Sequence, residues 1–154
     1  SMSSLANLVP VSEASLAAGR KLFQINCAVC HGDKADGKGA ATRYLFPGIS
    51  LVNDLAKGRS DGYIFGMMRN GRGLMPSYNR IEEMDRWDVV NYLRALQGQV
   101  IGIPFETGPL ARPGVAGDKL PGPSRLGPTR AIPFRSDRTP DAAAASATRP
   151  GGGA

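Results

Sequence analysis

The chain has 154 residues, of which 42% are hydrophobic, and carries a formal net charge of +6 at neutral pH. This length suits one ordinary domain rather than two, and no run approaches the roughly 20 apolar residues of a membrane-spanning helix. The basic balance favours acidic protein partners or a membrane surface. The net charge is only weak evidence for nucleic-acid binding, because no block of Lys and Arg interleaves with aromatic residues.

Residues 1–11 predict an extended lead-in, with Met2 in a frayed terminus. The first four residues do not resemble a signal peptide, so we expect that a leader was removed or that the chain is a processed or engineered product. Ser12 with Glu13 behind it predicts a helix N-cap and an acid in the first turn, and hence a helix from about residue 13.

The predicted first helix has one apolar face with a glycine in its middle. Leu16, Gly19, Leu22 and Phe23 recur at spacings of three and four. A glycine costs about 1 kcal/mol relative to Ala inside a helix. Either another element approaches closely at Gly19, or the glycine is incidental to an ordinary core helix.

The segment 27–31 reads Cys-Ala-Val-Cys-His, the attachment signature of a c-type haem. Cys27 and Cys30, on one short turn, can each form a thioether to a haem vinyl group. His31 then projects at the iron as the proximal ligand. Three alternative interpretations fit less well. A thioredoxin-like redox pair would need a βαβ pattern around the cysteines, which is absent, and a structural zinc site would need four Cys or His ligands, which the chain does not have. A disulfide between Cys27 and Cys30 would close a small, strained loop.

The middle of the chain predicts loops and short helices. The glycine-rich segment 32–39 predicts a polar turn, and residues 40–59 predict a loop with a short helix near 51–56. We expect the apolar side chains of the second segment to wall one haem face: Tyr44, Leu45, Phe46, Ile49, Leu51, Val52 and Leu55. Ser60 and Asp61 cap a further helix, which Asn70 and Gly71 end.

Met75 is the predicted sixth ligand of the iron. It lies in the loop 72–78 directly before Pro76, which restrains the backbone. The other four methionines fit less well, because they lie in the frayed terminus or in predicted helices: Met2, Met67, Met68 and Met84. If Met75 did not bind, the haem would be open to ligands, as in a peroxidase or a sensor.

Residues 83–97 predict the last helix, with Val89, Tyr92, Leu93 and Leu96 on one face. Together with the first helix, the Cys27–His31 motif and Met75, it resembles a class I monohaem cytochrome c over residues 12–98. The resemblance implies an all-α cytochrome c fold wrapped around one covalent haem c. It also implies outer-sphere electron transfer rather than enzymatic chemistry.

A narrower resemblance rests on the segment 75–78 followed by residues 85–97. Both are similar to the monohaem cytochrome c subunit of bacterial alternative complex III, a quinol-oxidising assembly. It implies a multihaem cytochrome among the partners and a peripheral location on the periplasmic side of the inner membrane. Members of that group are often lipoproteins; no cysteine is spare here, so we expect attachment through partner subunits. The alternative is a free, soluble periplasmic electron shuttle.

Residues 99–154 differ in composition from the rest of the chain. Pro, Gly and Ala occupy half of the positions 101–154, which predicts a long irregular C-terminal extension unable to bury a core of its own. We interpret it as an arm that wraps a partner subunit, against the alternative of a tail without a role. Its spaced apolar anchors would be Ile101, Ile103, Phe105, Leu110, Leu120, Leu126, Ile132 and Phe134.

Overall fold

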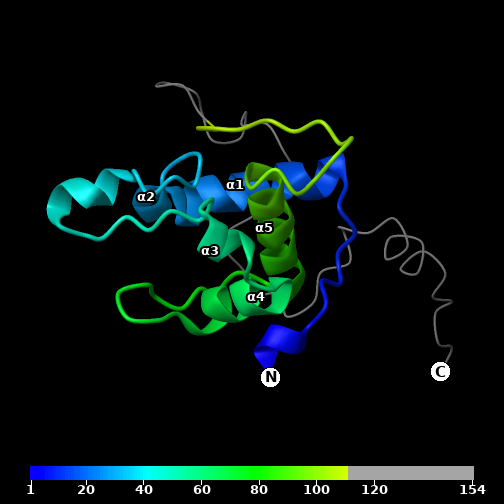
Figure 1. The fold of residues 1–154 in the computed structure, drawn as a ribbon, viewed down its shortest axis with the longest axis horizontal. Helices are drawn as coiled ribbons and strands as arrows, with labels where there is room; N and C mark the ends of the chain where they lie inside the picture. Colours follow the sequence, from blue (N-terminus) through cyan, green and yellow to red (C-terminus); the bar gives the residue numbers. More distant parts are fainter. Residues whose placement is uncertain (111–154) are drawn as a thin grey trace, which may run out of the picture.

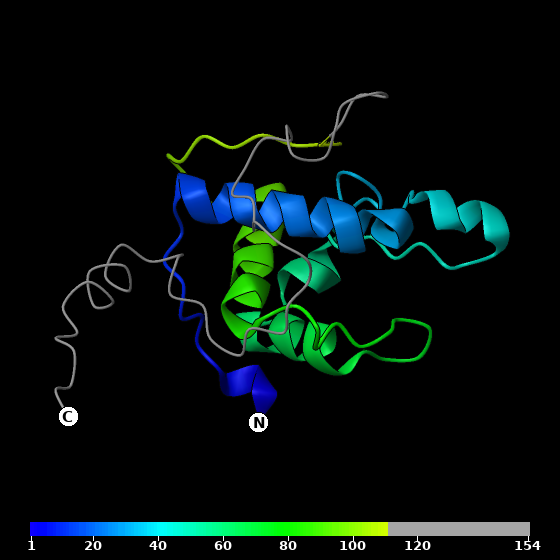
Figure 2. The same ribbon diagram turned by 180° about the vertical axis from the view of Figure 1, so that it is seen from behind.

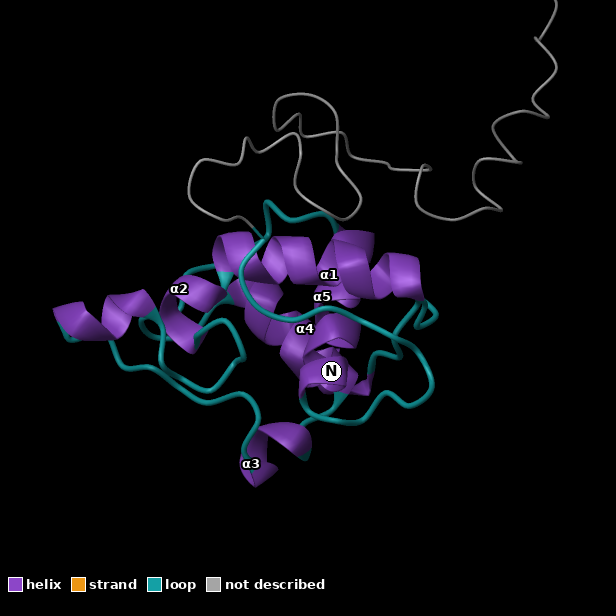
Figure 3. Ribbon diagram, turned by 90° about the horizontal axis from the view of Figure 1, so that it is seen from above, coloured by secondary structure: helices purple, strands orange, loops and turns teal. Residues whose placement is uncertain are grey.

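A computed structural model describes residues 1–110, and within them the regular structure is entirely helical (Figures 1 and 3). The predicted all-α fold is confirmed. In chain order the elements are η1 (Met2–Ser4), α1 (Glu13–Asn26), α2 (Ala28–His31), η2 (Ala40–Tyr44), α3 (Asp54–Lys57), α4 (Asp61–Asn70) and α5 (Glu83–Leu96).

The helix boundaries follow the capping residues of the sequence. Ser12 accepts a hydrogen bond from the backbone N–H of Ser15 at the start of α1, and Ser60 accepts one from Tyr63 at the start of α4. Gly71 ends α4 with φ +69°, a conformation that glycine adopts without strain. The predicted starts of these two helices, at residues 13 and 61, are confirmed.

The crossing of α1 over α5 is the largest contact between elements and forms the frame of the domain (Figure 1). Gly19 lies at the crossing. A Cβ atom there would collide with the carbonyl oxygen of Asp88 and would lie 2.7 Å from Cβ of Tyr92. Of the two interpretations of Gly19, close approach by another element is confirmed.

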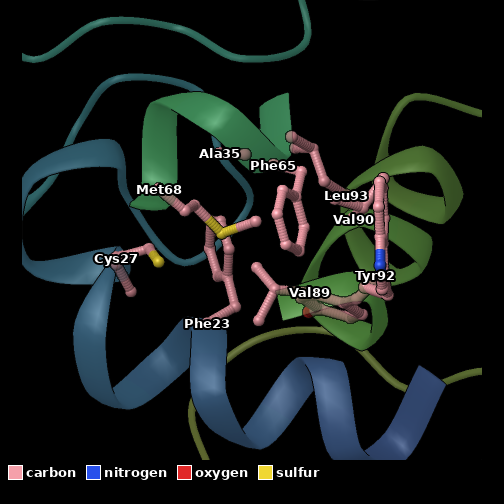
Figure 4. Close-up of a cluster of buried hydrophobic side chains, with 11 residues drawn as sticks. Phe23, Cys27, Ala35, Phe65, Met68, Val89, Val90, Tyr92 and Leu93 are labelled. Atoms are coloured by element: carbon pink, nitrogen blue, oxygen red, sulfur yellow. The ribbon is translucent and has the colours of Figure 1, made fainter. Parts of the chain in front are cut away.

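Aromatic side chains from α1, α4 and α5 converge in the core beside this crossing (Figure 4). Phe65 of α4 stacks on Trp87 of α5 with ring centroids 4.1 Å apart, and Phe23 of α1 meets Tyr92 edge-on at 5.5 Å. All four are at most 1% exposed. Burial of large aromatic side chains supplies much of the driving force for packing a small domain.

The N-terminal segment differs from the prediction, which was wrong about its beginning. Residues 2–4 form the 3-10 turn η1, which packs on α4, and Met2 lies against the hydrophobic core instead of fraying. The reason is two glycines of α4. A Cβ at Gly62 would collide with the carbonyl oxygen of Met2, and one at Gly66 would lie 3.1 Å from Cβ of Met2.

Residues 40–59 contain more regular structure than predicted. The helix η2 lies at one end of the molecule, in a segment expected to be loop, and α3 begins three residues later than the expected short helix (Figures 1 and 2). The backbone at Gly48, which follows η2, lies directly against the backbone at Gly37, because a Cβ at Gly48 would collide with the carbonyl oxygen of Gly37.

A buried polar network joins the start of α1 to α5. Ser15 donates a hydrogen bond of 2.8 Å to Asp88, and Asn91 donates one of 2.9 Å to the Ser15 hydroxyl. Asn7 of the lead-in donates to the Asn91 side-chain oxygen at 2.7 Å. Burial raises the pKa of Asp88 to about 7, against which the Ser15 hydrogen bond acts.

Packing on the domain continues past residue 98. Residues 99–110 run along α1 (Figure 1), where the buried Arg20 donates to the carbonyl oxygens of Gly108 at 3.3 Å and Pro109 at 3.1 Å and pairs with Glu106 at 2.6 Å. Phe105 meets Tyr92 edge-on with centroids 6.3 Å apart. Residues 111–154, and with them the anchors from Leu120 to Phe134, lie outside the described residues.

Candidate haem site

A cavity of about 540 Å³ opens between the crossed helices, α3, α4 and the loop that follows α4. Its volume falls within the range of small-molecule and cofactor sites, and its walls are mostly apolar. All four residues predicted to hold the haem line it: Cys27, Cys30, His31 and Met75. Sequence positions more than 40 residues apart therefore meet at one cavity.

The two cysteines stand where α1 passes into α2. Cys27 is the C-cap of α1 and the N-cap of α2, and its backbone N–H donates to the carbonyl oxygen of Phe23. Burial, with the neighbouring Cys30 as a smaller cause, raises the pKa of the Cys27 thiol to about 12. Both thiols are free of disulfide bonds. A buried thiol with a raised pKa differs from the low-pKa thiolate of a redox-active Cys-X-X-Cys pair.

The orientation of His31 is set by one backbone carbonyl. Its Nδ1 lies 2.8 Å from the carbonyl oxygen of Ile49. A carbonyl oxygen can only accept, so Nδ1 carries the proton and Nε2 keeps its lone pair for a metal. No pattern in the sequence predicts this partner, which lies 18 residues away in the loop after η2.

Met75 sits in a loop closed by backbone contacts. Arg72 and Met75 exchange backbone hydrogen bonds of 2.9 and 3.0 Å across the turn. The Ser77 hydroxyl donates to the carbonyl oxygen of Arg69 at 2.6 Å, and a Cβ at Gly71 would lie 2.6 Å from the carbonyl oxygen of Met75. The methionine is thus held on a short, constrained loop, as a weak thioether ligand requires.

Tyr78 ties this loop to the cysteine segment, a role that the sequence did not predict. Its buried hydroxyl donates to the carbonyl oxygen of Asn26 at 3.0 Å, immediately before Cys27. The guanidinium of Arg80 lies over the Tyr78 ring at 4.7 Å and donates to the side chain of Asn26 at 3.1 Å. Burial raises the pKa of the Tyr78 hydroxyl, which keeps it a donor.

The predicted apolar wall of the haem site is divided by the structure. Phe46, Ile49, Leu51 and Leu55 line the cavity as expected. Tyr44, Leu45 and Val52, in contrast, do not line it, so the prediction was wrong for these three. Tyr44 and Leu45 are 78% and 96% exposed at the end of η2, whereas Val52 packs against the core cluster. Of the other methionines, Met67 and Met68 also line the cavity.

These residues fit a covalently attached haem, since one apolar cavity gathers two thiols, an oriented imidazole and a thioether. The fold and the site define a cytochrome of the c type. A family model described as cytochrome c oxidase, cbb3-type, subunit III matches residues 14–93. The chain belongs to the family of monohaem class I cytochromes c.

Similarity to individual proteins points the same way. Cytochrome c6 of Cyanidioschyzon merolae is 33% identical over 85 residues, which cover 53% of this chain and 75% of that protein. A cytochrome c-553-like protein of Synechocystis is 35% identical over 79 residues, 51% of this chain and 66% of that protein. Cytochrome c6 of Cladophora glomerata is 34% identical over 87 residues, 51% and 85% of the two chains.

Membership of this family implies covalent haem c and a role in electron transfer with redox protein partners. Among residues 1–110, none of the helices combines the length and the apolar character that crossing a membrane would take.

Proposed function

We propose that this protein carries single electrons on one haem held by Cys27 and Cys30 through thioethers and by His31 and Met75 as axial ligands. The observation that supports this assignment is that all four side chains line one apolar cavity, from segments that other contacts hold in place. The haem, when bound, supplies the reversible one-electron couple of its iron.

The chain's own residues then serve to hold this couple in a fixed environment. The Ile49 carbonyl fixes the proton on Nδ1 of His31, and the closed loop around Met75 keeps its sulfur at the cavity. Apolar walls exclude water and raise the cost of the additional positive charge of the oxidised state. With His31 and Met75 both holding the iron, the group would exchange an electron without a substrate bound to the metal.

An optical spectrum of the holoprotein tests the ligand assignment. We expect the weak near-infrared band of sulfur-to-iron charge transfer in the oxidised form, and we expect its loss in Met75→Ala together with a lower midpoint potential. Met67→Leu, which changes another cavity-lining methionine, should retain the band. A band that survives in Met75→Ala, or its absence from the unaltered protein, would show that Met75 does not bind the iron.

For the physiological role, we propose a peripheral subunit of a quinol-oxidising complex of the alternative complex III type. It would receive electrons from a multihaem cytochrome on the periplasmic side of the bacterial inner membrane. The support is the motif resemblance of residues 75–78 and 85–97 and the basic charge of the chain. Co-purification with membrane partners, lost on deletion of residues 111–154, is the expected result.

A free periplasmic shuttle is the second candidate. It is favoured by the contacts of residues 106–109 with Arg20, because this first part of the extension packs on its own domain. If the chain truncated after residue 110 transfers electrons to a soluble acceptor as fast as the full chain, and no membrane partner is captured with either, the shuttle is correct.

A further inference from the structure

The last helix ends in a buried side-chain amide at the cavity. Gln97, the C-cap of α5, is 6% exposed and lines the cavity. Its Nε2 donates a hydrogen bond of 2.7 Å to the carbonyl oxygen of Leu51, and its Oε1 accepts one of 2.8 Å from Nη1 of Arg94. A guanidinium has no acceptor, so Oε1 must face Arg94 and the amide N–H must face Leu51. Both ends of the amide are therefore fixed.

Arg94 gives this amide a rigid support. Its side chain is only 12% exposed, and its Nε donates to a carboxylate oxygen of Asp61 at 2.7 Å. The same guanidinium donates to the carbonyl oxygens of Lys57 at 3.3 Å and Arg59 at 2.5 Å. One planar group with a paired charge thus joins the end of α3 to the start of α4. Gln97 is held from this junction as well as from its own helix.

Leu51 lies two residues from the carbonyl that orients His31. That carbonyl belongs to Ile49, and the Leu51 N–H donates to the carbonyl oxygen of Ala35 at 2.8 Å. Peptide units are planar and leave two soft dihedral angles per residue, so a carbonyl held at Leu51 restricts the one at Ile49. The hydrogen bond from Gln97 therefore acts on the short segment that positions the His31 ring.

We infer that Gln97 is a positioning residue, which acts through residues 49–51 to keep the Ile49 carbonyl within hydrogen-bond distance of Nδ1 of His31. This inference rests on the proposed function, because it concerns His31 as a ligand of the iron. A carbonyl that accepts from Nδ1 makes the imidazole more basic, and a more basic imidazole favours the oxidised state of the iron. Gln97 thereby lowers the midpoint potential, while Arg94 maintains the position of Gln97.

Two substitutions that keep the net charge test this role. Gln97→Leu removes the amide, and Arg94→Lys loses the planar fork. The measurement is NMR spectroscopy of the reduced holoprotein with ¹⁵N-labelled histidine, which reports one imidazole because His31 is the only histidine of the chain. We expect the Nδ1 proton to exchange with deuterium about fivefold faster in Gln97→Leu, the effect of one lost hydrogen bond, and also faster in Arg94→Lys. The midpoint potential should rise in both.

Gln99→Leu is the matched control. Gln99 lies two residues beyond Gln97 and also donates to a backbone carbonyl, that of Lys57 at 3.3 Å. It does not line the cavity, and its acceptor lies in α3 rather than in the segment 49–51. The same substitution there should leave both the exchange rate of the His31 proton and the midpoint potential unchanged.

An exchange rate that is equal in Gln97→Leu and the unaltered protein would overturn the inference. A potential that falls, together with loss of the near-infrared sulfur band, would also overturn it, because that combination reports release of Met75 and not a change at His31. The oxidised holoprotein tests the proposed function separately, since the ring nitrogens of an iron-bound imidazole show large paramagnetic shifts. If His31 lacks these shifts, the ligand assignment fails and the inference falls with it. If the shifts are present while the exchange rates are equal, only the role of Gln97 is wrong.

Discussion

Replacement of Gly19 by alanine tests whether the crossing of α1 and α5 determines the stability of the domain. Two opposing effects contribute. Alanine favours an α-helix over glycine by about 1 kcal/mol. Against this, the new Cβ would collide with the Asp88 carbonyl oxygen and would lie 2.7 Å from both the Asp88 carbonyl carbon and Cβ of Tyr92. No change of rotamer relieves contacts with main-chain atoms and a Cβ, so the two helices must move apart.

Overpacking of this kind costs about 3 kcal/mol at the upper end of its usual range. After the gain of about 1 kcal/mol in helix propensity, the free energy of unfolding should fall by about 2 kcal/mol. Urea unfolding of the holoprotein, followed by far-ultraviolet circular dichroism, measures it. Gly58→Ala is the matched control, because Gly58 is already in the right-handed helical region and its nearest neighbour would be 3.5 Å away. A Gly19→Ala protein within about 0.5 kcal/mol of the unaltered one would refute the reasoning.

Three further changes have defined outcomes. Asp88, with a pKa raised from 3.8 to about 7, keeps its proton in the folded protein over a pH range where the unfolded chain has lost it. Unfolding free energy should therefore fall as pH rises from about 4 to 7, and Asp88→Asn should flatten that slope in urea titrations at several pH values. Tyr78→Phe, which removes the donor to the segment before the cysteines, should let imidazole bind the oxidised haem about fivefold more tightly, whereas exposed Tyr44→Phe should not. Arg20→Gln should speed hydrogen–deuterium exchange of residues 105–109, and equal exchange would show that other contacts hold this segment.

The helices and their caps could be predicted because their signals are local. A serine at the N-cap, an acid in the first turn and apolar residues in the turns that follow all lie within one stretch of chain, as in α1 and α4. The thiol and imidazole candidates were equally local, since Cys27, Cys30 and His31 lie within one turn. Met75 was chosen by excluding the other methionines, and the structure places it at the same cavity.

What could not be predicted depends on contacts between distant segments. The turn η1 is only three residues long, too short for a periodic pattern, and its position depends on two glycines of α4 some 60 residues away. A charged residue such as Arg20 is expected on the solvent face of an amphipathic helix. Arg20 is nevertheless only 8% exposed, because residues 106–109 cover it. A composition rich in Pro and Gly predicts irregular structure, and residues 99–110 form no helix or strand, but composition does not reveal that these residues pack on the domain.

Close backbone contacts explain how a small domain can hold the two proposed iron ligands, His31 and Met75, on short irregular segments. The carbonyl that orients His31 belongs to Ile49, whose neighbour Gly48 lies directly against Gly37 in the opposite leg of the same loop. The Met75 carbonyl likewise lies against Gly71, where any side chain would collide. In both cases a glycine lets two main chains touch, and main-chain atoms cannot relax by changing rotamer as a side chain can. The positions of the two proposed ligands are therefore determined by the backbone of the loops, whereas the apolar side chains of the cavity would determine the environment of a bound haem.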